Sequence, residues 1–174
     1  MAFTPGALPF GARQVVLTPQ SGNKVEVAVA MAIDFSPDVI SGTLEGNDQI
    51  SAVDSIVRSY TWSLNSGGLD FDARQVVLGV NTLTSGSSPN VVNWTSLQGG
   101  SEMPYFQMDV RVLADDGGDS WVTMYHCKMT GISEGAAYGQ YWQPNINGIA
   151  IARGSSNVIA TLRTRETTIE LPLS

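Results

Sequence analysis

YTWSLNSGGLDFDARQVVLG, residues 60–79, decides the fold, because its periodicity changes from that of a strand to that of a helix. Tyr60, Trp62 and Leu64 alternate with small polar residues, which is the period of two that a half-buried strand shows. Residues 65–68 (NSGG) then break the pattern with turn residues. A strand is therefore expected to end here.

After this break the pattern predicts one short amphipathic helix. Apolar residues recur at helical spacing, at Leu69, Ala73, Val76 and Val77. Asp70 and Asp72 lie in the expected first turn, where carboxylates suit the helix N-terminus, and Gly79 lies where a glycine commonly ends a helix. No other segment predicts a helix as well, so this helix is expected to cover an apolar face of a sheet.

The rest of the chain shows strand patterns separated by turn residues. Strands are expected at 12–19, 24–35, 39–45, 50–64, 104–114, 120–132, 148–153 and 158–170. Residues 36–38 (SPD) are expected to separate two of them. The pattern predicts a mainly β fold, an antiparallel β-sandwich or partly open barrel with one short α-helix, in a single domain over residues 1–174.

Three segments lack a clear period: an N-terminal arm (1–11) and two long loops (80–103 and 133–147). Long loops in compact domains tend to be functional. The two loops still carry large apolar or aromatic side chains, which we take as candidates for contacts between subunits: Val91, Trp94, Leu97, Tyr141 and Trp142. Docking of the 80–103 residues on the chain's own core is the alternative.

The sequence contains one short internal repeat. GALPFGARQVVL (6–17) and GGLDFDARQVVL (67–78) match at nine of twelve positions. Nothing further along the chain repeats at the same offset, so a domain duplication is not indicated. The first copy is expected to be arm and strand, and the second to be helix. The alternatives are that both copies are helical, or that both dock at equivalent places.

Composition limits the function classes. The net charge is −7, with only two lysines, so the basic patch needed to grip phosphates is missing. Charged residues make up 14% of the chain, and such depletion suits surfaces that meet other subunits. A polar, weakly charged β domain is the alternative reading. The sequence predicts neither a signal peptide nor a membrane helix.

Catalytic and metal chemistry is not indicated. Cys127 and His126 are the only cysteine and histidine, and as strand neighbours they are expected to point to opposite faces, which is a poor geometry for a nucleophile pair. No cluster with metal-ligand spacing and no phosphate-binding glycine loop is present in the sequence. We expect no enzyme activity, no cofactor and no metal.

The order of parts resembles the major tail tube proteins of long-tailed bacteriophages. The resemblance rests on the GTLEGND turn at residues 42–48, the strand-to-helix passage at 60–79, and the PNINGIAI return at 144–151. It spans most of the chain in order and length. These motifs are individually degenerate, and the 80–103 segment is left without assigned roles.

The resemblance implies a virion protein that forms hexameric rings, whose β-sheets join into an inner barrel and whose rings stack into a tail tube. It implies a conduit for DNA, without specific DNA binding. Implied partners are other copies of the chain, the tape-measure protein, the tail terminator and tail-tip proteins, with assembly in the cytoplasm of a host bacterium. Acidic candidates for the lumen are Glu26, Asp34 and Asp109. Strand alternation places Glu26 and Asp34 on one shared face of the expected strand 24–35, opposite its apolar set, and places Asp109 opposite Met108 and Val110 in the same way. Solvation on the outer surface is the alternative for each.

Other functions remain open at this point. They are a tail terminator, a capsid decoration protein, a tube protein of a contractile injection system, and a carbohydrate-binding β-sandwich module. The last would use loop aromatic residues as a sugar platform, from among Trp94, Tyr138, Tyr141 and Trp142.

Overall fold

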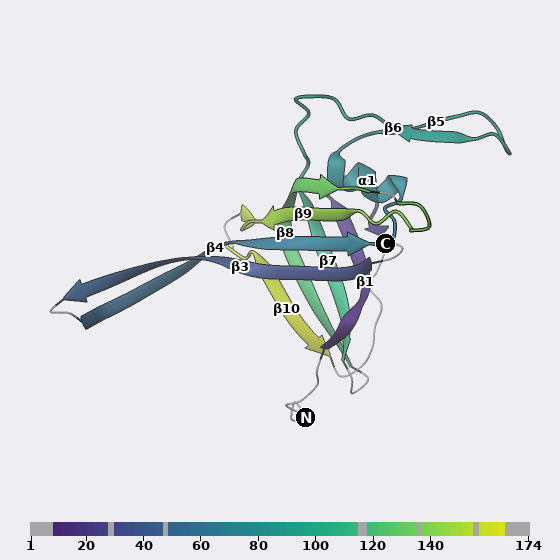
Figure 1. Cartoon of the computed structure of the whole chain (residues 1–174). Helices are drawn as coiled ribbons and strands as arrows, with labels where there is room; N and C mark the ends of the chain where they lie inside the picture. The colour runs from purple at the N-terminus through teal and green to yellow at the C-terminus, as the bar shows by residue number, and fades with distance from the viewer. Residues whose placement is uncertain are drawn as a thin grey trace.

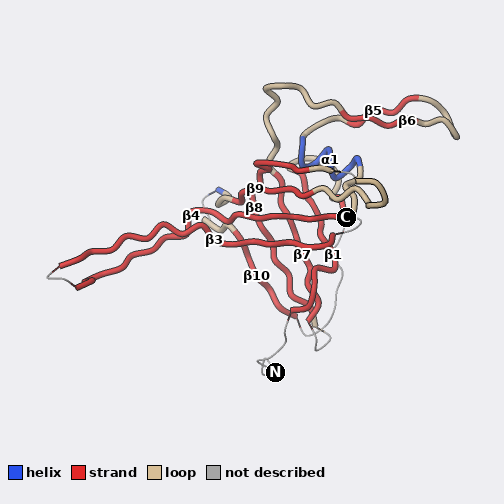
Figure 2. The backbone as a smooth tube through the Cα atoms, in the orientation of Figure 1, coloured by secondary structure: helices blue, strands red, loops and turns tan. Residues whose placement is uncertain are grey.

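The computed structural model describes residues 9–27, 30–46, 49–114, 118–135, 137–154 and 157–165 (Figures 1 and 2). The elements in chain order are β1 (Pro9–Pro19), β2 (Val25–Glu26), β3 (Ala30–Gly46), β4 (Gln49–Ser66), α1 (Phe71–Leu78), β5 (Thr82–Ser85), β6 (Val92–Thr95), β7 (Phe106–Ala114), β8 (Asp119–Ser133), β9 (Asn145–Ala150) and β10 (Ala160–Arg165).

The strands form one large antiparallel sheet in the order β2-β1-β7-β8-β9-β4-β3, and β10 also pairs with β8. Strand β8 changes its partner along its length. Its first half pairs with β10 over residues 119–124, and its second half pairs with β9 over residues 127–133. Between the halves lies His126, whose φ of 45° lies in the left-handed region. The expected mainly β, antiparallel fold with one short helix is confirmed, and the described strands do not close into a barrel.

The hydrophobic core lies beneath α1 and contains buried residues of β1, β4, β7, β8 and β9. The face predicted from residues 60–64 is confirmed, since Trp62 and Leu64 are buried and Thr61 is exposed. The Trp62 ring meets the Phe106 ring edge-on, with 5.8 Å between the centroids. Helix α1 adds Ala73, Val76, Val77 and Leu78 to the same cluster.

The C-terminal cap of α1 is the one expected from the sequence, whereas Asp70, expected in the first turn, is instead the N-cap. Asp70 precedes the helix in extended conformation, and its carboxylate accepts a hydrogen bond from the Ala73 backbone N–H at 2.7 Å. Gly79 ends the helix with a φ of 68°, and its N–H donates to the carbonyl of Gln75. Both ends are thus satisfied within a helix of only eight residues.

These caps also explain why the two copies of the internal repeat adopt different structures. The identical hexapeptide ARQVVL lies in β1 at residues 12–17 and in α1 at residues 73–78, as expected. The first copy has Pro9 where the second has the capping Asp70, and Thr18 where the second has Gly79. The flanking residues therefore supply the second copy alone with helix caps, and the first copy instead pairs along β7.

The expected break at residues 36–38 is wrong, because β3 continues through Pro37 to Gly46. Proline is tolerated here because β3 is the last strand of the sheet, so no neighbour needs the missing N–H. The expected single strand 24–35 is divided between β2, which pairs with β1, and β3, which pairs with β4. The regular alternation of apolar residues over 24–35 does not indicate that the chain changes its pairing partner within this stretch.

Other boundaries also differ from expectation. Strand β1 begins at Pro9, so residues 9–11 of the expected arm are strand, and residues 1–8 lie outside the described part. The segment 80–103, expected to be irregular, contains the β5–β6 hairpin. Strand β9 begins inside the expected 133–147 loop, and β10 pairs with β8 rather than with β9. Residues 166–170 of the last expected strand are outside the described part.

Gly148 of β9 is expected to tolerate no side chain. A Cβ there would lie 2.1 Å from the Trp62 ring and 2.5 Å from the Lys128 carbonyl oxygen, so the core would have to shift. Overpacking of this kind costs about 1–3 kcal/mol, and we expect Gly148→Ala to lower the free energy of unfolding in urea by that amount. Gly131→Ala in β8, with open space at its Cβ, is the matched control. Equal stability of both variants would contradict this packing.

Candidate functional site

A long hairpin leaves the body of the protein at the ends of β3 and β4 (Figure 2). Strand β9 pairs with β4 only from Tyr60 to Asn65. Beyond that point, in the described chain, β3 and β4 pair only with each other. We call residues 39–46 of β3 and residues 49–57 of β4 the β3–β4 arm. In Figure 1 it extends to the left, away from all other labelled elements.

A cross-strand ion pair marks the base of the β3–β4 arm. The Arg58 guanidinium donates two hydrogen bonds to one oxygen of Asp38, at 2.7 and 3.0 Å, and Ser59 donates a third at 3.2 Å. Hydrogen bonding to Arg58 lowers the pKa of the Asp38 carboxyl below its usual value. The strand register shifts between Asp38 and Val39, immediately beyond this pair. Such irregularities bend and twist a strand pair, so the base is where the arm can change direction.

The β3–β4 arm carries large apolar side chains that are 45–66% exposed: Val39, Ile40, Leu44, Val53, Ile56 and Val57. Ile40 pairs with Ile56, and Val39 pairs with Val57. Because successive strand residues point to opposite faces, each face of the arm carries large apolar side chains, with Asp54 also on the Ile40 face.

A two-stranded hairpin with two exposed apolar faces is marginal on its own in water. Its outer backbone edges are also unpaired within the described chain, which makes them a template for further strands. The arm therefore has the surface and the free hydrogen-bonding groups of a segment that is covered by a partner.

Sequence reasoning did not identify the β3–β4 arm as a site, although it placed strands at 39–45 and 50–64. The available signal was the adjacent apolar pairs Val39-Ile40 and Ile56-Val57, since neighbours of this kind give a strand two apolar faces. The sequence could not show that no other part of the described chain covers them.

The candidates in the 80–103 segment lie on or beside the β5–β6 hairpin. Trp94 is in β6, opposite Leu83 in β5, and Val91 and Leu97 flank β6. All four are at least 40% exposed, so docking on the chain's own core is not what the structure shows. Their contact with other subunits remains a prediction.

The two candidates in the 133–147 loop differ from each other. Tyr141 is 86% exposed. Trp142 is half-exposed, and the Arg74 guanidinium of α1 lies over its ring at 5.9 Å. Arg74 also forms an ion pair with Glu134 at the start of the same loop. This loop is therefore anchored to α1 within its own chain.

The three acidic candidates are not brought together on one strand face. Glu26 is exposed on β2 and Asp34 is exposed on β3, so the expectation that they share one strand is wrong. Asp109 on β7 is half-buried and accepts hydrogen bonds from Thr123 at 2.6 Å and from Gln107 at 2.9 Å. Their position relative to a lumen remains a prediction.

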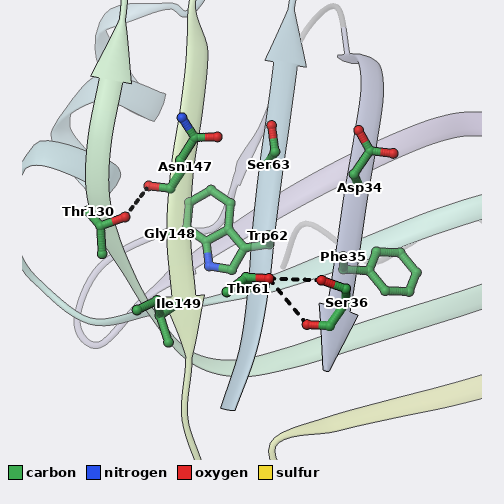
Figure 3. A pocket seen from close by; sticks show the side chains of 10 residues that line it. All are labelled: Asp34, Phe35, Ser36, Thr61, Trp62, Ser63, Thr130, Asn147, Gly148 and Ile149. Carbon is green, nitrogen blue, oxygen red and sulfur yellow. Dashed lines mark hydrogen bonds between the residues drawn. The ribbon is translucent and has the colours of Figure 1, made fainter. Parts of the chain in front are cut away.

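Asp34 borders an open hollow of about 460 Å³ on the outer face of β3, β4, β9 and β8 (Figure 3). The hollow is lined by hydroxyl and amide groups, those of Ser36, Thr61, Ser63, Thr130 and Asn147, together with the apolar side chains of Phe35, Trp62 and Ile149. Thr61 pairs with Ser36 at 3.0 Å, and Thr130 donates to the Asn147 carbonyl at 3.3 Å. This sheet face thus mixes polar and apolar side chains and carries one carboxylate here.

Two further expectations concern metals and membranes. Among the described residues, no three His, Cys, Asp or Glu side chains are grouped to hold a metal ion. None of the described helices has the length and apolar character to cross a bilayer.

Cys127 and His126 have different surroundings. The His126 ring stacks on Tyr105 at 5.2 Å between centroids, whereas Cys127 is fully buried and its thiol donates to the Met124 carbonyl. Burial raises the pKa of the Cys127 thiol to about 12.

Cys127 is therefore expected to be inert in the folded protein. The thiolate is the reactive form, and it is scarce at pH 8 when the pKa is this high. Ellman's reagent should leave the native protein unmodified and react with one thiol per chain in guanidinium chloride. Fast reaction under native conditions would contradict the buried, protonated thiol.

Fold and surface together define an antiparallel β protein with a projecting apolar arm. The sequence matches no protein-family model and no curated protein. Among solved structures, the chain is similar to a chain in the cryo-EM structure of the anti-feeding prophage (AFP) baseplate, 6-fold symmetrised. The identity is 10% and the TM-score 0.46, over 96% of this chain and 100% of that one. Functional inference therefore depends on the surfaces of the chain itself.

Proposed function

We propose that the chain is a structural subunit of a phage tail or tail-like particle, and that it assembles with copies of itself into the tail tube. The β3–β4 arm is the observation that carries this proposal. Six large apolar side chains on two faces are about half exposed or more, and water is a poor environment for so large a patch. A subunit that is always incorporated into an assembly hides such an arm against its neighbours.

The remaining surface supports assembly in the same way. Charged residues are only 14% of the chain, and interface cores are depleted in charge. The last strand, β3, and the β5–β6 hairpin leave backbone edges unpaired in the described chain. Edges of this kind are an aggregation hazard for a monomer and become joints between subunits in an assembly.

The proposal of a tail tube, with stacked hexameric rings around a DNA conduit, rests on the resemblance noted in the sequence. Six copies of a chain with net charge −7 would carry −42 per ring. An acidic tube repels the phosphate backbone, so DNA slides instead of binding. The sheet face around Asp34 is the candidate lining of this tube. Tape-measure, terminator and tail-tip proteins are the proposed partners.

Negative-stain electron microscopy of the purified full chain across a concentration series tests this function. Stacked rings or hollow tubes of uniform diameter are expected, with light scattering rising over the same range. Single rings that never stack would favour a tail terminator instead. A chain that stays monomeric at every concentration would contradict self-assembly.

A further inference from the structure

A second hairpin, β5–β6, also projects from the body and exposes large apolar side chains, as the β3–β4 arm does. Strands β5 and β6 pair only with each other in the described chain. In Figure 1 this hairpin extends to the upper right, on the side of the body opposite to the β3–β4 arm. The two projections are therefore different surfaces at opposite ends of one molecule.

The β5–β6 hairpin has one apolar and one polar face. Leu83 pairs with Trp94, and Val92 lies two residues from Trp94, so the three share a face. All three are 40–59% exposed. On the other face, Thr84 donates to the side-chain oxygen of Asn93 at 2.7 Å. The hairpin thus presents a single apolar face whose large side chains are about half exposed in the described chain.

We propose that the β3–β4 arm of one copy docks on the apolar face of the β5–β6 hairpin of the next copy. This inference rests on the proposed self-assembly and names the surface that receives the arm. On one face of the arm, Ile40 pairs with Ile56, and Leu44 lies four pairs further out. Gly42 between them, which pairs with Asp54, has open space at its Cβ position, and a large side chain such as Trp94 can approach there.

Charge favours this pairing over contact between two arms. Residues 39–57 hold three acidic residues and no basic one, so two arms side by side would bring six carboxylates together. Residues 80–101, which contain the β5–β6 hairpin, hold no charged residue at all. Like charges across an interface are costly, and the uncharged hairpin avoids that cost.

The marginal stability of each hairpin supports the same match. A two-stranded ribbon is marginal alone in water, and packing the apolar face of one ribbon on that of the other removes exposed apolar side chains from water. Because donor and acceptor surfaces differ and lie on opposite sides, the contact is heterologous. Every docked copy still offers a free arm and a free hairpin, so the contact continues until it closes into a ring or extends as a filament.

Disulfide trapping between two full-length variants tests this pairing. Ile40→Cys and Leu83→Cys are each made on a Cys127→Ala background, mixed as monomers, concentrated and oxidised. Mixing should produce a cross-linked dimer that is absent from either variant alone. Leu44→Cys with Leu83→Cys repeats the test in case Ile40→Cys weakens the contact. Thr84→Cys, on the polar face of β5, is the matched control and should lose most of the cross-link.

The outcomes separate the inference from the function on which it rests. Cross-linking of the Ile40→Cys variant with itself, as strong as in the mixture, would overturn the inference in favour of arm-to-arm contact. Assembly seen by light scattering without any mixed dimer would also overturn it and leave self-assembly standing. Absence of assembly in the unmodified chain would remove both.

Discussion

Arg111→Met is expected to destabilise the folded chain by about 3–5 kcal/mol, because it leaves a buried carboxylate without its cationic partner. The Arg111 Nε lies 3.2 Å from the Asp119 Oδ2, across the β7–β8 hairpin. The Asp119 side chain is fully buried, and that of Arg111 is 7% exposed. Urea unfolding followed by tryptophan fluorescence measures the change.

A double variant separates the loss of the ion pair from the loss of arginine packing. In Arg111→Met/Asp119→Asn the buried charge is gone, so a large part of the lost stability should return. Arg58→Met at the exposed Asp38 pair is the matched control, since exposed ion pairs contribute little to stability. A loss in the double variant as large as in Arg111→Met alone would show that the lost packing of the arginine, not the lost ion pair, dominates.

Ile40→Thr/Ile56→Thr is expected to weaken self-assembly about a hundredfold. Burying an isoleucine is worth at least about 1.5 kcal/mol, and the two changes together remove about 3 kcal/mol from each contact. Threonine keeps the branched β-carbon that suits a strand, so the hairpin itself should persist. The concentration at which light scattering begins to rise measures the effect.

Leu162→Thr on β10 is the control for removing an exposed apolar side chain elsewhere, since Leu162 is as exposed as Ile56. Its onset concentration should stay near that of the unmodified chain. Both variants should unfold at the same urea concentration as the unmodified chain, because Ile40, Ile56 and Leu162 all lie outside the core. An arm variant that assembles like the parent would contradict the role given to the β3–β4 arm.

The elements that the sequence predicts well are those with local signals. Asp70 and Gly79 mark the ends of α1 because capping is a matter of a few neighbouring residues. Trp62 and Leu64 are buried as their alternation indicates. The end of β4 also follows from a local pattern, although the strand runs to Ser66, two residues into the expected turn at 65–68.

The elements that it predicts poorly depend on which strand lies beside which. Pro37 is tolerated only because β3 is the last strand of the sheet, and this edge position is a tertiary fact. Likewise, the alternation over 24–35 is the same whether one strand or two carry it. The exposure of Ile40 and Ile56 depends on the absence of a covering element, which no local pattern encodes. The candidate site was therefore the feature hardest to predict.

Hydrogen–deuterium exchange over residues 39–57, compared between dilute and concentrated samples of the full chain, tests directly whether the β3–β4 arm joins copies of this protein. In the dilute monomer the arm's amides should exchange quickly, because two strands with free edges open easily. In the concentrated sample they should become protected, while the core strand β7 stays protected in both. Equally fast exchange of the arm at every concentration would contradict the account.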